Sequence, residues 1–268
     1  MDGLQAMVTV GKMVIVAGAA FIAWTALTSS PAYADEVRDF APNRPSRSDS
    51  PFTVPIGFIQ VETDLANYTH PGEVLQTLDP TIIYGLTNRI DIGLSIGGLI
   101  TQRSNAVSSA GYGDTIVKAK FSLTGDDGGP VAFAVIPYVK IPTAPIPIGD
   151  GQVEGGINMP MLVTLPSHLQ LTVEPELAEL KSSQTSGQQA SFIGVVNLGR
   201  QIAGALSGFV ELYTQTFAGR AAGSPFVTFD YGFAYLVAKD VQLDVGANAG
   251  LNRYTPALNI YSGLAFRF

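Results

Sequence analysis

The residues of this chain that could do chemistry are charged side chains that recur in pairs two positions apart. The pairs are Glu62 with Asp64, Lys118 with Lys120, and Glu174 with Glu176. Two carboxylates that share a face could act as general acid and base, as in glycoside hydrolysis, if a substrate cleft lay between them. The sequence shows no such cleft. A period of two also places charges on the inner face of a β-sheet that encloses a lumen, and we favour that interpretation.

Histidine and cysteine, the other residues that often carry catalysis or bind metals, are scarce. The chain has no cysteine, so thiolate metal sites, disulfides and lipid-modified cysteines are excluded. Its two histidines, His70 and His168, fall in a loop and in a turn at opposite ends of the predicted strands. A lipid hydrolase built on a barrel would need a histidine on a strand. We therefore predict no catalytic residue, no metal and no cofactor.

The elements that position the charged pairs are best seen at the end of the chain, in residues 259–268. Ile260, Leu264 and Phe266 fall on one face at period two, with small or polar residues between them, and the chain ends on Phe268. An edge strand of a soluble sandwich is one interpretation. The segment is also similar to the last strand of bacterial outer-membrane barrels, whose terminal Phe the assembly machinery recognises. On that resemblance, Phe266 and Phe268 form an insertion signal.

The amino-terminal residues 1–34 predict a secretory signal peptide. Lys12 precedes an apolar run over residues 13–27, and Ala32 and Ala34 form a small-x-small cleavage site. An uncleaved anchor is the alternative, but 15 residues are short for a bilayer. Beyond residue 34 no apolar run is long enough for a spanning helix.

The next segment, residues 35–56, is polar and contains four prolines, so we expect an extended periplasmic lead-in. The whole chain has a net charge of −7 and shows no basic patch. Nucleic-acid binding needs such a patch to displace counterions, so no nucleic-acid partner is expected.

Residues 57–268 alternate strand-like segments with turn-rich gaps, and the gaps are short and long in turn. The predicted strands cover residues 57–68, 78–86, 90–99, 113–123, 131–141, 156–165, 169–180, 191–198, 205–215, 225–236, 241–250 and 259–268. Residues 101–112 are expected to be a polar loop, and residues 199–204 a turn. The pattern predicts an all-β protein: a monomeric, transmembrane, antiparallel β-barrel of 12 strands in the outer membrane, with its short turns in the periplasm.

The alternation also predicts which side chains face the lumen. The charged members of this inner face are Glu62, Asp64, Asp79, Asp91, Asp114, Lys118, Lys120, Lys140, Glu174, Glu176, Glu211, Asp230, Asp244 and Arg267. Acids outnumber bases, so the lumen should be acidic. Either water or ion pairing must compensate the buried charges, and both a hydrated pore and a packed interior stay open. A barrel of this size admits only small solutes.

Two finer expectations follow from the same alternation. The lysines at 118, 120 and 140 come from neighbouring strands, so we expect one basic strip that faces the acids at 62 and 64, or at 174 and 176, across the lumen. On the opposite face, Tyr231, Phe233, Tyr235 and Phe266 are expected to form part of the lipid-facing aromatic belt.

Several segments resemble the outer-membrane transporters grouped under the phenol-degradation (MetA-pathway) name. The matching segments are R-P-S-R-S-D-S-P-F-T-V-P at 44–55, G-x-x-Q-x-E at 57–62, Y-G-L-T-N-R at 84–89 and G-Y-G-D at 111–114. The resemblance implies an outer-membrane channel for passive uptake of small solutes, aromatic or hydrophobic compounds among them. It implies outer-membrane lipid, the barrel-assembly machinery and a small solute as partners. A structural barrel without permeation, or a barrel lipid hydrolase, are the alternatives.

Overall fold

A computed structural model describes residues 38–104, 107–125, 129–181, 187–218 and 224–268 of the chain. The predicted signal peptide lies outside these residues. The elements are β1 (Ile59–His70), β2 (Val74–Thr77), β3 (Thr81–Thr87), β4 (Ile90–Ile96), β5 (Leu99–Ser104), β6 (Val107–Tyr112), β7 (Thr115–Thr124), β8 (Val131–Ile141), β9 (Glu154–Asn158), β10 (Met161–Leu165), the 3-10 turn η1 (Pro166–His168), β11 (Leu169–Lys181), β12 (Gln188–Ala203), β13 (Leu206–Phe217), β14 (Phe226–Ala238), β15 (Val241–Gly250) and β16 (Leu258–Arg267). Within the described ranges no helix is long and apolar enough to cross a membrane.

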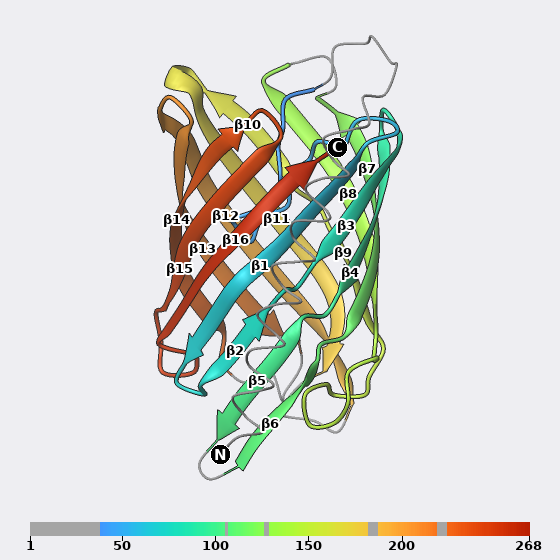
Figure 1. The fold of residues 1–268 in the computed structure, drawn as a ribbon, viewed down its shortest axis with the longest axis vertical. Coiled ribbons are helices and arrows are strands. Elements are labelled where there is room, and N and C mark those ends of the chain that lie inside the picture. Colours follow the sequence, from blue (N-terminus) through green and yellow to red (C-terminus); the bar gives the residue numbers. More distant parts are fainter. Residues whose placement is uncertain (1–37, 105–106, 126–128, 182–186, 219–223) are drawn as a thin grey trace, which may run out of the picture.

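These segments form a closed antiparallel barrel of 12 wall strands, which confirms the predicted fold class (Figure 1). Four wall strands are each built from two consecutive segments: β2 with β3, β4 with β5, β6 with β7, and β9 with β10. The last strand closes on the first, and Gln60 lies opposite Arg267 in this seam. At the end of the seam the backbones of Ile59 and Phe268 exchange two hydrogen bonds of 2.9 Å. Closure removes the sheet edges of the wall except along β6, which pairs with β5 alone among the described strands.

The wall alternates apolar and polar side chains, as the period of two requires. In β13, Val210 and Leu212 point outward and are 43% and 46% exposed, whereas Glu211 between them points into the lumen and is 2% exposed. The aromatic residues Tyr231 and Phe233 of β14 are also exposed on the outer surface. An apolar outer surface around a polar interior is the inverse of a soluble barrel and places the protein in the outer membrane.

Two local predictions differ from the structure. Residues 101–112 are not a loop: most belong to the hairpin of β5 and β6, which extends the wall beyond the long-loop end of the barrel (Figure 1). Outside the bilayer a strand needs no apolar outer face, so the polar composition of this stretch misled the prediction. Residues 199–204 are not all turn either, because β12 continues to Ala203 and pairs with β13 up to Leu206.

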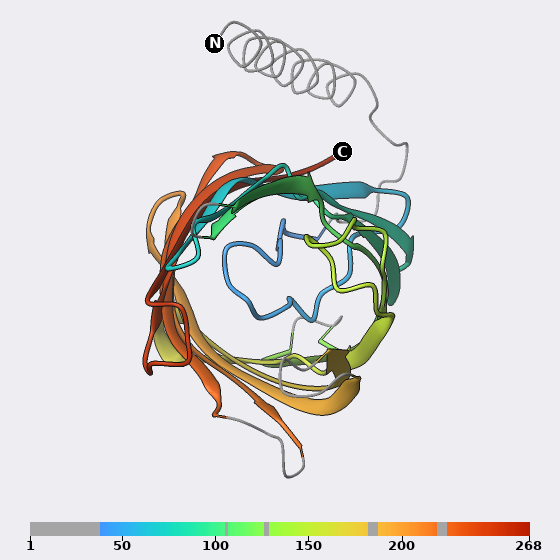
Figure 2. The ribbon, with the colours of Figure 1, turned by 90° about the horizontal axis from the view of Figure 1, so that it is seen from below.

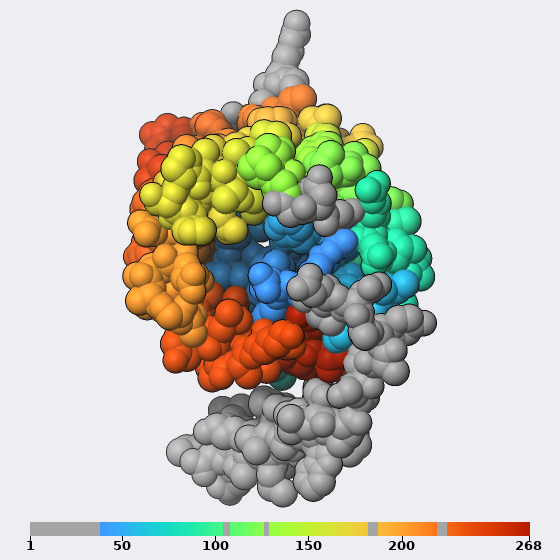
Figure 3. All heavy atoms as spheres, turned by 90° about the horizontal axis from the view of Figure 1, so that it is seen from above, coloured from blue at the N-terminus to red at the C-terminus, as the bar shows by residue number. Residues whose placement is uncertain are grey.

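Residues 38–56 lie inside the barrel (Figure 2). The sequence had instead predicted an extended periplasmic lead-in over residues 35–56. Figure 2 shows this segment as a loop within the ring of strands, and Figure 3 shows its atoms filling much of the mouth at the short-turn end. The segment starts and finishes at that end: Arg38 donates to Asn88 O, and Gly57 N donates to Gly85 O. We call residues 38–56 the plug segment. The sequence of this stretch shows no periodicity, which is why its composition suggested a linker.

Candidate functional site

The inner face of the barrel and the plug segment together form the candidate site, and Arg44 is its most connected side chain. Its Nη2 and Nε atoms donate to the two oxygens of Asp244 at 2.8 and 3.2 Å, and its Nη1 pairs with Asp64. The guanidinium also lies 5.9 Å from the centre of the Tyr261 ring. Two carboxylates on β1 and β15 thus hold one arginine against the strand between them. Gly263 provides the space for this arginine, because a Cβ at that position would overlap the Arg44 guanidinium.

Arg47 anchors the next part of the plug segment to β13 and β14, the two strands that follow β15 around the wall. Its Nε lies 3.0 Å from Asp230 Oδ2, and its guanidinium lies 4.3 Å from the centre of the Tyr213 ring. The backbone N–H of Arg47 donates to Glu211 Oε1 at 3.0 Å. Both carboxylates are fully buried, so the plug segment supplies the partners that make their burial tolerable.

Asp49 reverses the polarity of these contacts. Here the acid belongs to the plug segment: its carboxylate accepts from Lys118 Nζ and from Asn158 Nδ2, both at 3.0 Å. Its backbone N–H donates to Glu174 Oε2 at 2.7 Å. Lys120 donates to the carbonyl oxygen of Phe52 at 3.1 Å. Opposite charges of the wall and the plug segment therefore pair at Arg44, Arg47 and Asp49.

The remaining contacts carry the plug segment around the whole circumference. Glu62 accepts the backbone N–H groups of Asn43 and Arg44, each at 3.2 Å, and Asp91 accepts the N–H of Val54 at 3.0 Å. Wall strands that bond the plug segment through side chains are β1, β4, β7, β9, β11, β13, β14, β15 and β16. The plug segment therefore acts as a partition across the lumen.

The predicted basic strip is not formed, because its three lysines have separate partners. Lys118 and Lys120 bind the plug segment, whereas Lys140 lies among Asp114, Asp150 and Glu154 at 3.2, 3.0 and 3.0 Å. The Lys140 group ties the loop of residues 142–153 to the wall at the long-loop end. Sequence alternation placed the lysines on the inner face but could not show what lies in front of them.

Asp150 belongs to this loop, and several opposing effects set the pKa of its carboxyl. Burial raises the pKa of the Asp150 carboxyl, while the N–H of Gln152 and the ammonium of Lys140 lower it. The lowering effects prevail, so the pKa lies below the ordinary aspartate value and the carboxylate stays charged over the neutral range.

The other predicted inner residues also have local partners. Glu176 accepts from the hydroxyl of Tyr138 at 2.5 Å. Arg267 pairs with Asp240 at the short-turn end, and its guanidinium lies 5.4 Å from the ring of Phe40 in the plug segment. On the outer surface, the rings of Phe266 and Phe268 stack with their centres 6.0 Å apart.

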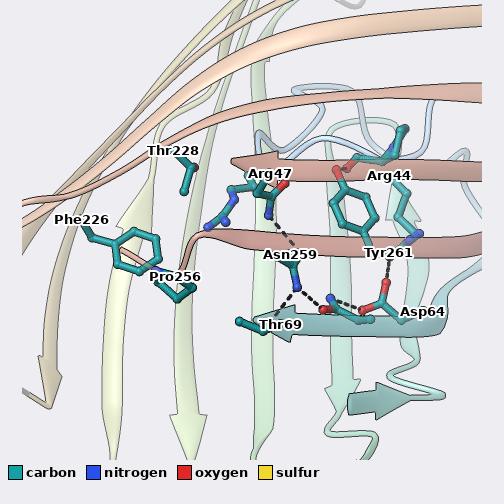
Figure 4. Close-up of a pocket in the computed structure, with 12 residues that line it drawn as sticks. Arg44, Arg47, Asp64, Thr69, Phe226, Thr228, Pro256, Asn259 and Tyr261 are labelled. Carbon is teal, nitrogen blue, oxygen red and sulfur yellow. Dashed lines mark hydrogen bonds and ion pairs between the residues drawn. The ribbon is translucent and has the colours of Figure 1, made fainter. Parts of the chain in front are cut away.

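Two cavities adjoin the partition among the described residues. The first cavity has a volume of about 420 Å³ and faces the long loops, and we call it the outer vestibule (Figure 4). It is lined by Arg44, Pro45, Arg47, Asp64, Asn67, Thr69, Phe226, Thr228, Asn248, Pro256, Asn259 and Tyr261. The second, about 840 Å³, faces the short turns; this inner vestibule includes His168, Gln170 and Arg200 in its wall. Arg44 and Pro45 line both. They therefore lie between the two cavities.

The histidines stay apart. His70 ends β1 at the long-loop end, whereas His168 lies in η1 at the short-turn end. Among the described residues no group of three or more histidine and acidic side chains could hold a metal ion.

Sequence reasoning missed the residues that the plug segment contributes, chiefly Arg44, Arg47 and Asp49. A signal was present. The inner face carries a surplus of acid, and two arginines stand close together in a segment that no strand pattern accounts for.

The family model described as "Putative MetA-pathway of phenol degradation" matches residues 42–268, which include most of the plug segment and the whole barrel. The chain belongs to this family. The resemblance read from the sequence motifs is thus confirmed. No curated protein matches the chain.

Solved structures support the fold. An outer-membrane channel from Pseudomonas putida F1 aligns with a TM-score of 0.61 at 13% identity, covering 84% of this chain and 100% of that one. A KdgM porin, solved in complex with disordered oligogalacturonate, aligns with a TM-score of 0.50 at 12% identity, covering 79% of this chain and 99% of that one. At these identities the likeness concerns the barrel architecture.

Proposed function

We propose that this protein is an outer-membrane channel for passive entry of small solutes, with the plug segment controlling passage. The observation that carries the proposal is the pair of vestibules, which open toward opposite ends of the barrel and meet at Arg44 and Pro45. A barrel that served only as a scaffold would have no need of cavities that open toward both of its ends. The family description brings aromatic and hydrophobic compounds into the set of solutes to be tested.

The acidic surplus of the inner face supports a preference for cations and neutral solutes over anions. Arg44 is shared by two carboxylates, and Arg47 also contacts two, so the plug segment does not neutralise the wall completely. A field of this sign inside a low-dielectric wall favours cations and weakens as salt is added.

Reversal potentials in planar bilayers under a salt gradient test both statements. We expect measurable conductance with cation preference, and a smaller preference in the Glu174→Gln, Glu176→Gln double variant. Absence of conductance would favour the scaffold alternative, and anion preference would refute the selectivity. His70→Gln with His168→Gln serves as the test of the hydrolase alternative: the channel should conduct unchanged, and hydrolysis of a lipid that this variant abolishes would contradict the proposal.

A further inference from the structure

A row of polar side chains crosses four adjacent wall strands near the long-loop end. In the sheet register Thr69 lies opposite Asn259, which lies opposite Asn248. Asn248 in turn lies opposite Asp230, so the row runs from β1 through β16 and β15 to β14. Its first three members line the outer vestibule (Figure 4). Because neighbouring strands lie about 4.8 Å apart, Thr69 and Asn248 stand roughly 10 Å from each other.

A carboxylate fixes the orientation of the amides in this row. Asp64 pairs with Arg44 and can only accept, so Asn67 presents its Nδ2 to Asp64 Oδ2, at 2.9 Å. Asn67 Oδ1 then accepts from Asn259 Nδ2 at 2.6 Å, and Asn259 Oδ1 accepts from Asn248 Nδ2 at 3.2 Å. Asn248 Oδ1 is thus left at the end of the chain, buried and without a donor among the described residues.

Donors stand on both sides of this acceptor. Thr69 Oγ1 accepts from Asn259 Nδ2 at 2.8 Å, so the proton of the Thr69 hydroxyl can be donated to a ligand. At the other end of the row, Arg47 has its Nε 3.0 Å from Asp230 Oδ2, and its side chain is 30% exposed. A buried acceptor without a donor is costly, so a ligand whose groups both donate and accept is stabilised here. Hydroxyl groups do both.

The charges around the vestibule disfavour an ionic ligand of either sign. The lining carries the guanidiniums of Arg44 and Arg47 and one carboxylate, that of Asp64. Asp244 and Asp230 do not line the cavity, but each holds one of these guanidiniums, at 2.8 and 3.0 Å. A cation would meet the guanidiniums, whereas an anion would compete with the carboxylates that already hold them. A neutral ligand incurs neither cost.

Aromatic and proline side chains complete the lining. Phe226, Pro256 and Tyr261 belong to it. Phe226 lies near Arg47, because Tyr213 contacts both: its ring centre is 6.1 Å from that of Phe226 and 4.3 Å from the Arg47 guanidinium. A sugar ring presents hydroxyl groups at its rim and C–H groups on its faces, so it matches polar and apolar surface together.

The dimensions of the vestibule indicate the length of the ligand. Its volume of about 420 Å³ falls within the range of about 300–1,000 Å³ that is usual for small-molecule sites. The stretch of roughly 10 Å from Thr69 to Asn248 is longer than one pyranose ring and suits two rings.

We propose that the outer vestibule binds a neutral saccharide of disaccharide length. One ring bonds Asn248 and Arg47 and packs against Phe226, and the second ring reaches Thr69. This inference rests on the proposed channel function, for which it names the class of solute. A phenol carries a single hydroxyl and cannot bond both ends of the row.

Saturation-transfer NMR of the full barrel, in a detergent without a sugar headgroup, measures the binding. Maltose, cellobiose and sucrose are the disaccharide probes, and glucose is the single-ring probe. Glucosamine and glucuronate add one positive or one negative charge to that ring, and phenol is the aromatic comparison.

Two variants divide the site. Asn248→Leu removes the buried acceptor, and Thr69→Val keeps the shape of the side chain but removes its hydroxyl. Thr172→Val makes the same change in the inner vestibule and is the matched control.

We expect at least one disaccharide to bind more tightly than glucose, and glucose more tightly than glucosamine, glucuronate or phenol. Loss of a neutral hydrogen bond weakens affinity by about two- to twelvefold, so Asn248→Leu should weaken glucose and the disaccharide alike by about that factor. Thr69→Val should weaken the disaccharide by a similar factor and leave glucose unchanged, and Thr172→Val should change neither. A loss confined to one of two ligands cannot come from misfolding.

Absence of binding by all three disaccharides, tighter binding of a charged ring, or equal losses of glucose and disaccharide in Thr69→Val would overturn the site. Phenol that binds more tightly than every sugar would do the same. Swelling of proteoliposomes in the same sugars separates the two proposals. A barrel that admits small solutes but binds no sugar refutes the site and leaves the channel, whereas a barrel that binds sugar but admits no solute supports the site and refutes the channel.

Discussion

Replacing Arg44 by Met should open the partition while the barrel stays folded. The substitution keeps much of the aliphatic length and removes three charge-assisted contacts to two inward carboxylates. Removing one partner of a buried ion pair costs about 3–5 kcal/mol, because the remaining charge has no compensation. The barrel can escape this cost if the plug segment moves and water reaches Asp64 and Asp244.

At about 1.4 kcal/mol for each factor of ten, the equilibrium constant for docking of the plug segment should therefore fall by a factor of about 10² to 4 × 10³. Single-channel recording in planar bilayers measures the result as a higher open probability and a larger conductance. Arg200→Met is the matched control, since Arg200 lines the inner vestibule and its side-chain Nε donates to the neighbouring Gln201 O.

A second substitution sharpens the test. Asp244→Asn added to Arg44→Met removes one of the uncompensated charges, so the double variant should recover part of the closed population. If Arg44→Met and Arg200→Met conduct alike, then Arg44 does not hold the partition and the reasoning from its ion pairs is refuted.

Three further outcomes are expected. The pKa of Asp150 is lowered in the folded protein, so its bond to Lys140 should be complete above the ordinary aspartate pKa of about 4 and be lost as the pH falls through the lowered pKa. Hydrogen exchange of residues 142–153 measures this loss, and Asp150→Asn should abolish its pH dependence. Gly263→Ala should raise conductance by displacing the arginine beside it, whereas Gly194→Ala, where an added Cβ meets only ordinary contacts, should not; equal behaviour would contradict this account of the glycine. Phe268→Asp should leave the protein out of the outer membrane, as fractionation would show, and normal membrane levels would remove the proposed insertion signal.

The barrel could be predicted because its physics is local and periodic. Glu211 lies between Val210 and Leu212, and only a strand puts the acid on one face and both apolar neighbours on the other. The same regularity repeats twelve times, so errors in single segments did not change the architecture. The prediction from this regularity was wrong in the hairpin of β5 and β6, because a strand outside the bilayer needs no apolar face.

The partition could not be predicted, because its determinants are distant in the chain and follow no period. Arg44 pairs with one acid 20 residues away and another 200 residues away. Alternation identified both acids as inward but gave no means of choosing their partner, since a hydrated pore satisfies the same charges. The lysines show the same limit: the strands set their direction, but the plug segment supplies the partners of Lys118 and Lys120, and the loop of residues 142–153 supplies one partner of Lys140.

Both ends of the plug segment lie at the short-turn end of the barrel, and this has a topological consequence. The segment enters and leaves the barrel at the short-turn end, so residues 38–56 form a loop that does not thread through the long-loop end. Withdrawal therefore needs neither cutting the chain nor breaking the β1 and β16 seam. A closed barrel can release and reinsert its own partition repeatedly, so opening is compatible with an intact wall.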